Sequence, residues 1–88
     1  MHYRIAADTL SASLSDGAVL LHLHTKRYFS LNDAGARIWA LLEQQCSEEQ
    51  IANTLVGEYE VDPSEAKKTV HQLLEELLAE RLIETCSH

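Results

Sequence analysis

The 88-residue sequence has few cysteines, few basic residues and no long apolar run, and each shortage excludes a class of protein. The two cysteines, Cys46 and Cys86, are far apart, so we expect free thiols in a reducing compartment rather than a disulfide framework. No apolar run approaches the roughly 20 residues that cross a bilayer, and the N-terminal segment lacks the apolar stretch of a signal peptide. We therefore expect a cytoplasmic protein with no membrane as a partner.

Basic side chains are half as numerous as acidic ones. Seven Lys and Arg against 14 Asp and Glu give a formal net charge of −7. Residues 1–31 hold 3 basic and 2 acidic side chains, a net charge of +1, whereas residues 32–88 hold 4 basic and 12 acidic ones, a net charge of −8. Because an acidic surface repels phosphate groups, we expect no nucleic acid as a partner.

The rest of the composition is that of a globular protein. Hydrophobic residues make up 45% of the chain and charged residues 24%, which is too apolar for a disordered segment. A chain of this length buries only about 60–65% of its unfolded surface. We therefore expect one small domain over residues 1–88, with one core.

The N-terminal part has the two-residue period of β-strands. Apolar and polar residues alternate strictly over 10–14, which predicts a half-buried strand. Asp16 and Gly17 follow, a pair typical of a tight hairpin because glycine accepts a positive φ. Residues 18–24 then return, and a second turn leads into a third strand over 27–31. This predicts a three-stranded antiparallel meander whose third strand lies at a sheet edge, open to another chain.

The period changes at Asn32, and helices follow. Asn32 is placed to cap a first helix, predicted over about 33–44, by accepting from the free N–H groups of its first turn. Ser47 and Gln50 have the spacing of a capping box, which predicts a second helix over about 47–58.

A third helix is predicted over about 63–80, with Asp62 as its N-cap and Pro63 at its first position. Its apolar stripe is wider than one core contact requires. Three strands followed by three helices predict an α+β fold of the winged helix-turn-helix-like type.

Two surfaces of this fold lack a partner: the open edge of the third strand and one flank of the third helix. If they lie side by side, they form a groove for an extended peptide, whose backbone would pair with the strand. Lys67 would then attract acidic side chains of the peptide. The predicted peptide-binding residues are Arg27, Tyr28, Phe29, Ser30, Leu31, Lys67, Val70, His71, Leu74 and Leu78. Leu74 and Leu78 are equally compatible with the core alone.

The run Tyr-Phe-Ser-Leu-Asn-Asp-Ala-Gly-Ala-Arg-Ile-Trp over 28–39 carries a family resemblance, together with Ser-Glu-Glu-Gln-Ile over 47–51 and Leu-Leu-Glu-Glu-Leu over 73–77. Over roughly residues 10–83 the chain resembles the PqqD family, the recognition elements for precursors of ribosomally made, post-translationally modified peptides. It is most similar to the free-standing leader-binding proteins of lasso peptide clusters. The resemblance implies a leader peptide between the third strand and third helix, and a separate leader peptidase or other maturation enzyme as a second partner.

Residues that could carry chemistry are sparse. His22 and His24 share one strand face, but no third ligand lies at a diagnostic spacing, so we expect no metal and no cofactor. Cys46 is placed to form a hydrophobic staple with Ile51 at the start of the second helix, which is a structural role. We therefore expect no enzymatic activity.

Two other functions are compatible with the predicted fold. In a winged-helix DNA-binding protein the third helix would enter the major groove, but its Lys67 and Lys68 are outnumbered by acidic residues. In a structural subunit, the open edge of the strand over 27–31 and the apolar helix flank would pair with a second copy of the chain.

Overall fold

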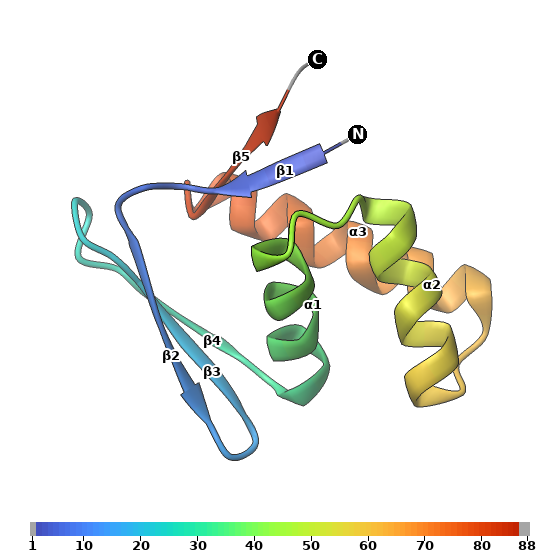
Figure 1. The fold of residues 1–88 in the computed structure, drawn as a ribbon. Helices are drawn as coiled ribbons and strands as arrows, with labels where there is room; N and C mark the ends of the chain where they lie inside the picture. The colour runs from blue at the N-terminus through green and yellow to red at the C-terminus, as the bar shows by residue number, and fades with distance from the viewer. Residues whose placement is uncertain (1, 87–88) are drawn as a thin grey trace.

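The computed structural model describes residues 2–86 (Figure 1). Its elements are, in order, β1 (His2–Ile5), β2 (Thr9–Leu14), β3 (Gly17–His22), β4 (Tyr28–Leu31), α1 (Asp33–Glu43), α2 (Glu48–Tyr59), α3 (Pro63–Ala79) and β5 (Ile83–Cys86). The predicted three-stranded antiparallel sheet followed by three helices is confirmed, with sheet order β2-β3-β4. In Figure 1, α1 lies between this sheet and α2.

The structure also contains a small sheet that the sequence analysis missed. β1 and β5 pair in antiparallel orientation, with Tyr3 opposite Thr85, and an ion pair joins Arg4 Nε to Glu84 Oε1 at 2.8 Å. Strands of four residues are too short for a periodic pattern to identify. The two ends of the described chain therefore lie side by side (Figure 1).

The three helices begin where their capping residues predict. The Asn32 side chain accepts a hydrogen bond from the Gly35 N–H at 2.8 Å. Ser47 and Gln50 form the predicted reciprocal capping box. The Asp62 carboxylate accepts from the Ser64 N–H at 2.9 Å, ahead of Pro63 in the first turn. These contacts satisfy N–H groups that would otherwise lack partners at the helix starts.

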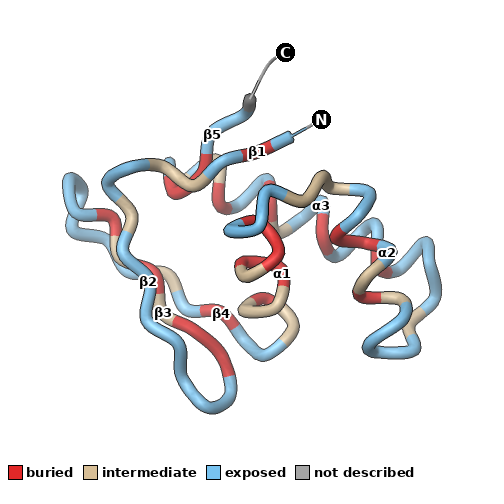
Figure 2. Tube along the Cα trace, in the orientation of Figure 1, coloured by how far each residue is buried: buried red, intermediate tan, exposed pale blue. Residues whose placement is uncertain are grey.

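The core forms where the sheet, α1, α2 and α3 meet (Figure 2). Its fully buried side chains come from β3, all three helices and the C-terminal segment: Leu20, Ile38, Leu42, Ile51, Val70, Leu74, Leu77, Leu82 and Ile83. α1 packs on β3 on one side and α2 on the other, so it links the sheet to the helical pair α2 and α3. No helix within residues 2–86 is long and apolar enough to cross a membrane.

Two expectations for the first hairpin are wrong. The strand over 10–14 is not half-buried, because Leu10 and Leu14 are 54% and 55% exposed. Gly17 does not have a positive φ. A Cβ on Gly17 would instead collide with the backbone carbonyl oxygen of Leu31, so glycine is required there by the close approach of β4.

Candidate functional site

The outer edge of β4 is open, as predicted. Within residues 2–86, β4 pairs only with β3. The His22 N–H donates to the Arg27 carbonyl oxygen at 3.0 Å, and bonded pairs alternate along an antiparallel ladder. The backbone groups of Phe29 therefore point to β3, whereas those of Tyr28 and Ser30 point away from the sheet. The edge thus offers two N–H donors and two C=O acceptors to an added strand.

A cleft of about 230 Å³ lies between β4 and α3. Phe29 and Leu31 of β4 contribute apolar side chains to it, and the start of α1 closes its floor. The wall on α3 consists of residues at the i, i+3, i+4 and i+7 positions of one helix face: Thr69, Gln72, Leu73 and Glu76. The predicted juxtaposition of the strand edge and the third helix is therefore present.

The flank of α3 that faces this cleft is not the flank that we predicted. Val70 and Leu74 are 0% exposed, belong to the core and do not line this cleft. Leu73, the neighbour of Leu74, is half-buried and lines the cleft instead. Successive helix residues are rotated by about 100° around the axis, so adjacent leucines point to different sides.

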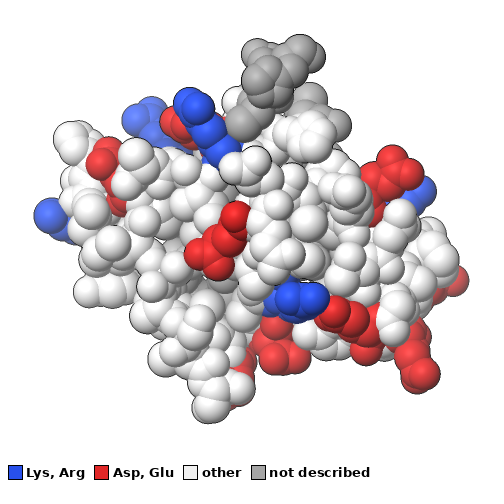
Figure 3. Space-filling view, in the orientation of Figure 1, with Lys and Arg blue, Asp and Glu red and all other residues white. Residues whose placement is uncertain are grey.

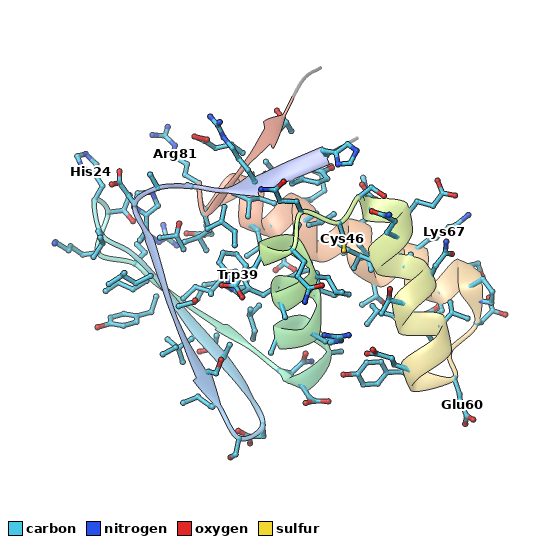
Figure 4. All side chains as sticks on the ribbon, in the orientation of Figure 1. His24, Trp39, Cys46, Glu60, Lys67 and Arg81 are labelled. Carbon is cyan, nitrogen blue, oxygen red and sulfur yellow. The ribbon has the colours of Figure 1, made fainter. Side chains whose placement is uncertain are left out.

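Lys67 and His71 lie on the side of α3 that faces α2. His71 Nδ1 is 3.1 Å from Glu48 Oε2, and Lys67 lines a separate hollow with residues of α2 (Figure 4). Neither residue lines the cleft beside β4. Lys67 therefore lies outside this cleft, and its attraction for acidic side chains of a bound peptide stays a prediction.

Leu78 and Arg27 lie beyond the cleft, near the end of α3 and just before β4. Leu78 lines a hollow beside His22 and the β3–β4 turn, outside the cleft. Arg27 Nη2 donates to Glu80 Oε2 at 3.2 Å, so it connects the start of β4 to the end of α3. Because Arg27 is mostly exposed, this ion pair adds little stability, but it joins the two walls.

A second apolar hollow, of about 220 Å³, continues the cleft towards the α2–α3 connection. Both hollows include Ala34 and Thr69. The Tyr59 hydroxyl donates to Asp33 Oδ2 at 3.1 Å on its rim, and burial together with this bond raises the pKa of Tyr59. The sequence did not predict this hollow, since only the fold brings the end of α2 to the start of α1.

Charge around the helices is predominantly acidic. Figure 3 shows carboxylates gathered over the α2 and α3 end of the molecule, while the sheet end carries scattered charged groups of both signs. On the exposed part of α3, Glu65, Glu75 and Glu76 oppose an approach to phosphates. The DNA-binding alternative gains no support from this surface.

His22 and Cys46 have structural roles. His22 is buried, and its Nδ1 accepts from the backbone N–H groups of His24 and Thr25, at 3.1 and 3.3 Å, so it holds the β3–β4 turn. Cys46 is a free thiol packed against the core. Among the described residues, no three His, Cys, Asp or Glu side chains are grouped as metal ligands.

Fold and cleft together define a winged-helix-like domain whose strand edge and third helix form one groove. The family model for coenzyme PQQ synthesis protein D (PqqD) matches residues 17–83. The chain belongs to the PqqD family, and the resemblance seen in the sequence is confirmed.

Three solved structures share this fold. The chain is 35% identical to TbiB1, solved in complex with the TbiA(beta) leader peptide, with a TM-score of 0.89 over 97% of this chain and 99% of that one. It is 27% identical to a lasso peptide synthetase B1 complexed with the leader peptide, with a TM-score of 0.87 over 97% and 100% of the two chains.

The third structure is the PqqD part of Methylobacterium extorquens PqqCD, described as a stand-alone recognition element for ribosomally synthesised and post-translationally modified peptides. It is 23% identical, with a TM-score of 0.77 over 96% of this chain and 89% of that one, which supports the fold alone. No curated protein matches this chain.

Proposed function

We propose that this protein binds the leader segment of a ribosomally synthesised precursor peptide and presents the precursor to a separate maturation enzyme. The observation that carries the proposal is the open edge of β4 facing an apolar cleft on α3. Two relatives with more than a quarter of their residues in common with this chain were solved with leader peptides bound.

The leader binds as an added strand. Its backbone pairs with the outward N–H and C=O groups of Tyr28 and Ser30, which gives orientation without sequence selectivity. Alternate side chains of a strand point to the same side, so every second residue of the leader faces the cleft. Those side chains supply the specificity.

The side chains that line the cleft set the preferred sequence. Phe29, Leu31 and Leu73 favour apolar leader side chains. Glu76 is the charged residue among the lining residues, so a neutral or basic side chain suits the position beside it better than an acidic one. These residues take the place of Lys67, His71 and Leu74 as the α3 contribution to the site.

Presentation to an enzyme requires no catalytic group in this chain. Holding the leader converts the attached core segment into a local substrate, with effective concentrations in the mM range for a short tether. The enzyme is a leader peptidase or cyclase, and both partners meet in the cytoplasm, where the precursor is made. The lasso peptide class is favoured by the lasso peptide synthetase B1 relative.

The test is a titration of a labelled leader peptide from the precursor encoded beside this chain. We expect a Kd in the micromolar range, about −8 kcal/mol, and failure to bind below about 100 μM would overturn the proposal. Leu73→Asp should weaken binding at least tenfold, about 1.4 kcal/mol, because a carboxylate in the cleft loses apolar contact and must be desolvated.

Ala79→Asp is the matched control. It places the same charge on an exposed position of α3, outside the lining of the cleft. It should leave the Kd unchanged, and circular dichroism should show that both variants are folded. Equal weakening by the two substitutions would mean that net charge, rather than the cleft, governs binding.

A further inference from the structure

The sheet has a second open edge, on β2, at the side opposite β4. Within residues 2–86, β2 pairs only with β3, in a continuous register from Thr9 opposite His22 to Leu14 opposite Gly17. β2 contains no charged residue, no proline and no bulge. Where such features are present on an exposed edge strand, they usually prevent it from pairing with another chain. Figure 2 shows β2 exposed along most of its length.

The apolar residues of β2 face solvent. Leu10 lies opposite Leu21, which lies opposite Tyr28, and residues opposite each other in a ladder project from the same face. Leu10 and Leu14 are more than half exposed, and Tyr28 is 72% exposed. This outer face therefore carries an uncovered apolar surface that leader binding at β4 does not explain.

The backbone of β2 has a definite pattern of free groups. The Leu23 N–H donates to the Asp8 carbonyl oxygen at 2.7 Å, in the same register as the β2–β3 ladder. Because bonded pairs alternate, Ala12 and the two leucines of β2 bond to β3, whereas the N–H and C=O groups of Ser11 and Ser13 point outward.

The outward N–H and C=O groups of one β2 strand can pair with those of β2 in a second, antiparallel copy. We propose that two copies of this chain associate through antiparallel pairing of their β2 strands, about a two-fold axis at Ala12. In this register Leu10 of each copy lies opposite Leu14 of the other copy. Ser11 lies opposite Ser13 of the second copy, so the outward backbone groups of these residues form four hydrogen bonds.

Other registers fit less well. A shift by one residue places an outer-face side chain opposite an inner-face one, which the pleat forbids. A shift by two residues separates Leu10 from Leu14. Only the register centred on Ala12 combines both leucine pairs with the outward backbone groups.

This edge carries less charge than the helices, although Asp8 and Asp16 flank β2 and lie beside each other's copies at the two ends of the pair. Residues 32–88 have a net charge of −8, so contact through the helices would bring two acidic surfaces together. The three strands β2, β3 and β4 contain no charged residue. Pairing at β2 forms a six-stranded sheet and leaves both β4 edges free at its two ends.

Cysteine cross-linking tests the register. In a background with Cys46→Ala and Cys86→Ser, Ala12→Cys should form a disulfide-linked dimer on mild oxidation, since residue 12 is the position that faces itself. Residue 11 faces residue 13 of the second copy, so the single variants Ser11→Cys and Ser13→Cys bring no two cysteines together. Each should cross-link far less. Equal cross-linking at all three positions, or none at residue 12, would overturn the proposed pairing.

Sedimentation equilibrium of the unmodified chain tests the association itself. A short edge interface is small, so we expect the mean mass to rise from monomer towards dimer between about 10 μM and 1 mM. Ala12→Lys places two like charges at the axis and should hold the protein monomeric, whereas Asn53→Lys, on exposed α2, should not. A monomer at about 1 mM, or a dimer that survives Ala12→Lys, would overturn the proposal.

Discussion

Gly17 shows how one residue can be fixed by a neighbour that is distant in sequence. A methyl group on Gly17 would meet the backbone carbonyl of Leu31, which cannot rotate away as a side chain would. We expect Gly17→Ala to lower the free energy of unfolding by about 2 kcal/mol or more, because β3 and β4 must separate. Urea denaturation measures the loss.

Gly57→Ala is the matched control for Gly17→Ala. Gly57 lies in α2 at an exposed position, and an added Cβ meets nothing within 4 Å. The substitution should raise the free energy of unfolding by about 0.5–1 kcal/mol, because alanine loses less backbone entropy in a helix. Similar effects at both positions would contradict the steric explanation.

Leu73 and Leu74 are adjacent, yet they have different surroundings. Leu74 is fully buried, so Leu74→Ala should cost about 2–5 kcal/mol of stability, the range for deleting a buried leucine side chain. Leu73→Ala should cost less and should act mainly on leader binding, because Leu73 lines the cleft. Denaturation and leader titration of both variants separate the two roles, and an equal loss of stability would contradict them.

At the scale of elements, pairing of the leader with β4 depends on the direction of the strand's backbone N–H and C=O groups rather than on its side chains. The Ser30 N–H points to the open edge, so Ser30→Pro removes a donor for the leader while the ladder with β3 remains. We expect binding to weaken at least tenfold, about 1.4 kcal/mol, in a folded protein, measured by leader titration and circular dichroism.

Phe29→Pro is the corresponding control within β4. The Phe29 N–H points to β3, so proline there breaks the sheet itself. This variant should be destabilised in urea, which Ser30→Pro should not be. If Ser30→Pro binds the leader with wild-type affinity, the leader does not pair with β4.

At the scale of the whole molecule, stability should have limits at both ends of the pH range. A hydrogen bond from Arg37 lowers the pKa of Glu58, and the Ser64 hydroxyl and N–H lower the pKa of Asp62. A lowered pKa contributes stability above the ordinary value of the group, and this stability is lost as the pH falls through the folded value. The free energy of unfolding should therefore decrease below about pH 4.

The alkaline limit has a different cause. Burial, and secondarily the nearby Glu48 carboxylate, raise the pKa of Tyr3, whose hydroxyl donates to Glu48 Oε1 at 3.2 Å. A raised pKa contributes stability below the ordinary value, about 10, that is lost as the pH rises through the folded value. Urea denaturation across the pH range should show this decrease, and Tyr3→Phe should reduce it. An unchanged alkaline decrease in Tyr3→Phe would assign it to other groups.

The sequence by itself determined the features that depend on near neighbours. Asn32, Ser47 and Asp62 cap helices because an N-cap bonds to N–H groups two or three residues away. The hairpin and the open edge of the third strand follow from the alternation of apolar and polar residues and the break between the alternating runs. These local signals also carried the PqqD resemblance, which covers the strand-to-helix junction.

Only the tertiary structure decided which faces meet. The apolar stripe on α3 predicts that one side of the helix is buried. The positions of α2 and β4 around the helix determine that Leu74 lies in the core and Leu73 lines the cleft. Alternation in β2 gives two faces without stating which one faces the core, and the structure turns Leu10 and Leu14 to solvent. The β1–β5 pair joins residues about 80 positions apart, and its register depends on the completed fold. Such contacts depend on how the elements pack against one another. The residue period of a single element does not specify that packing.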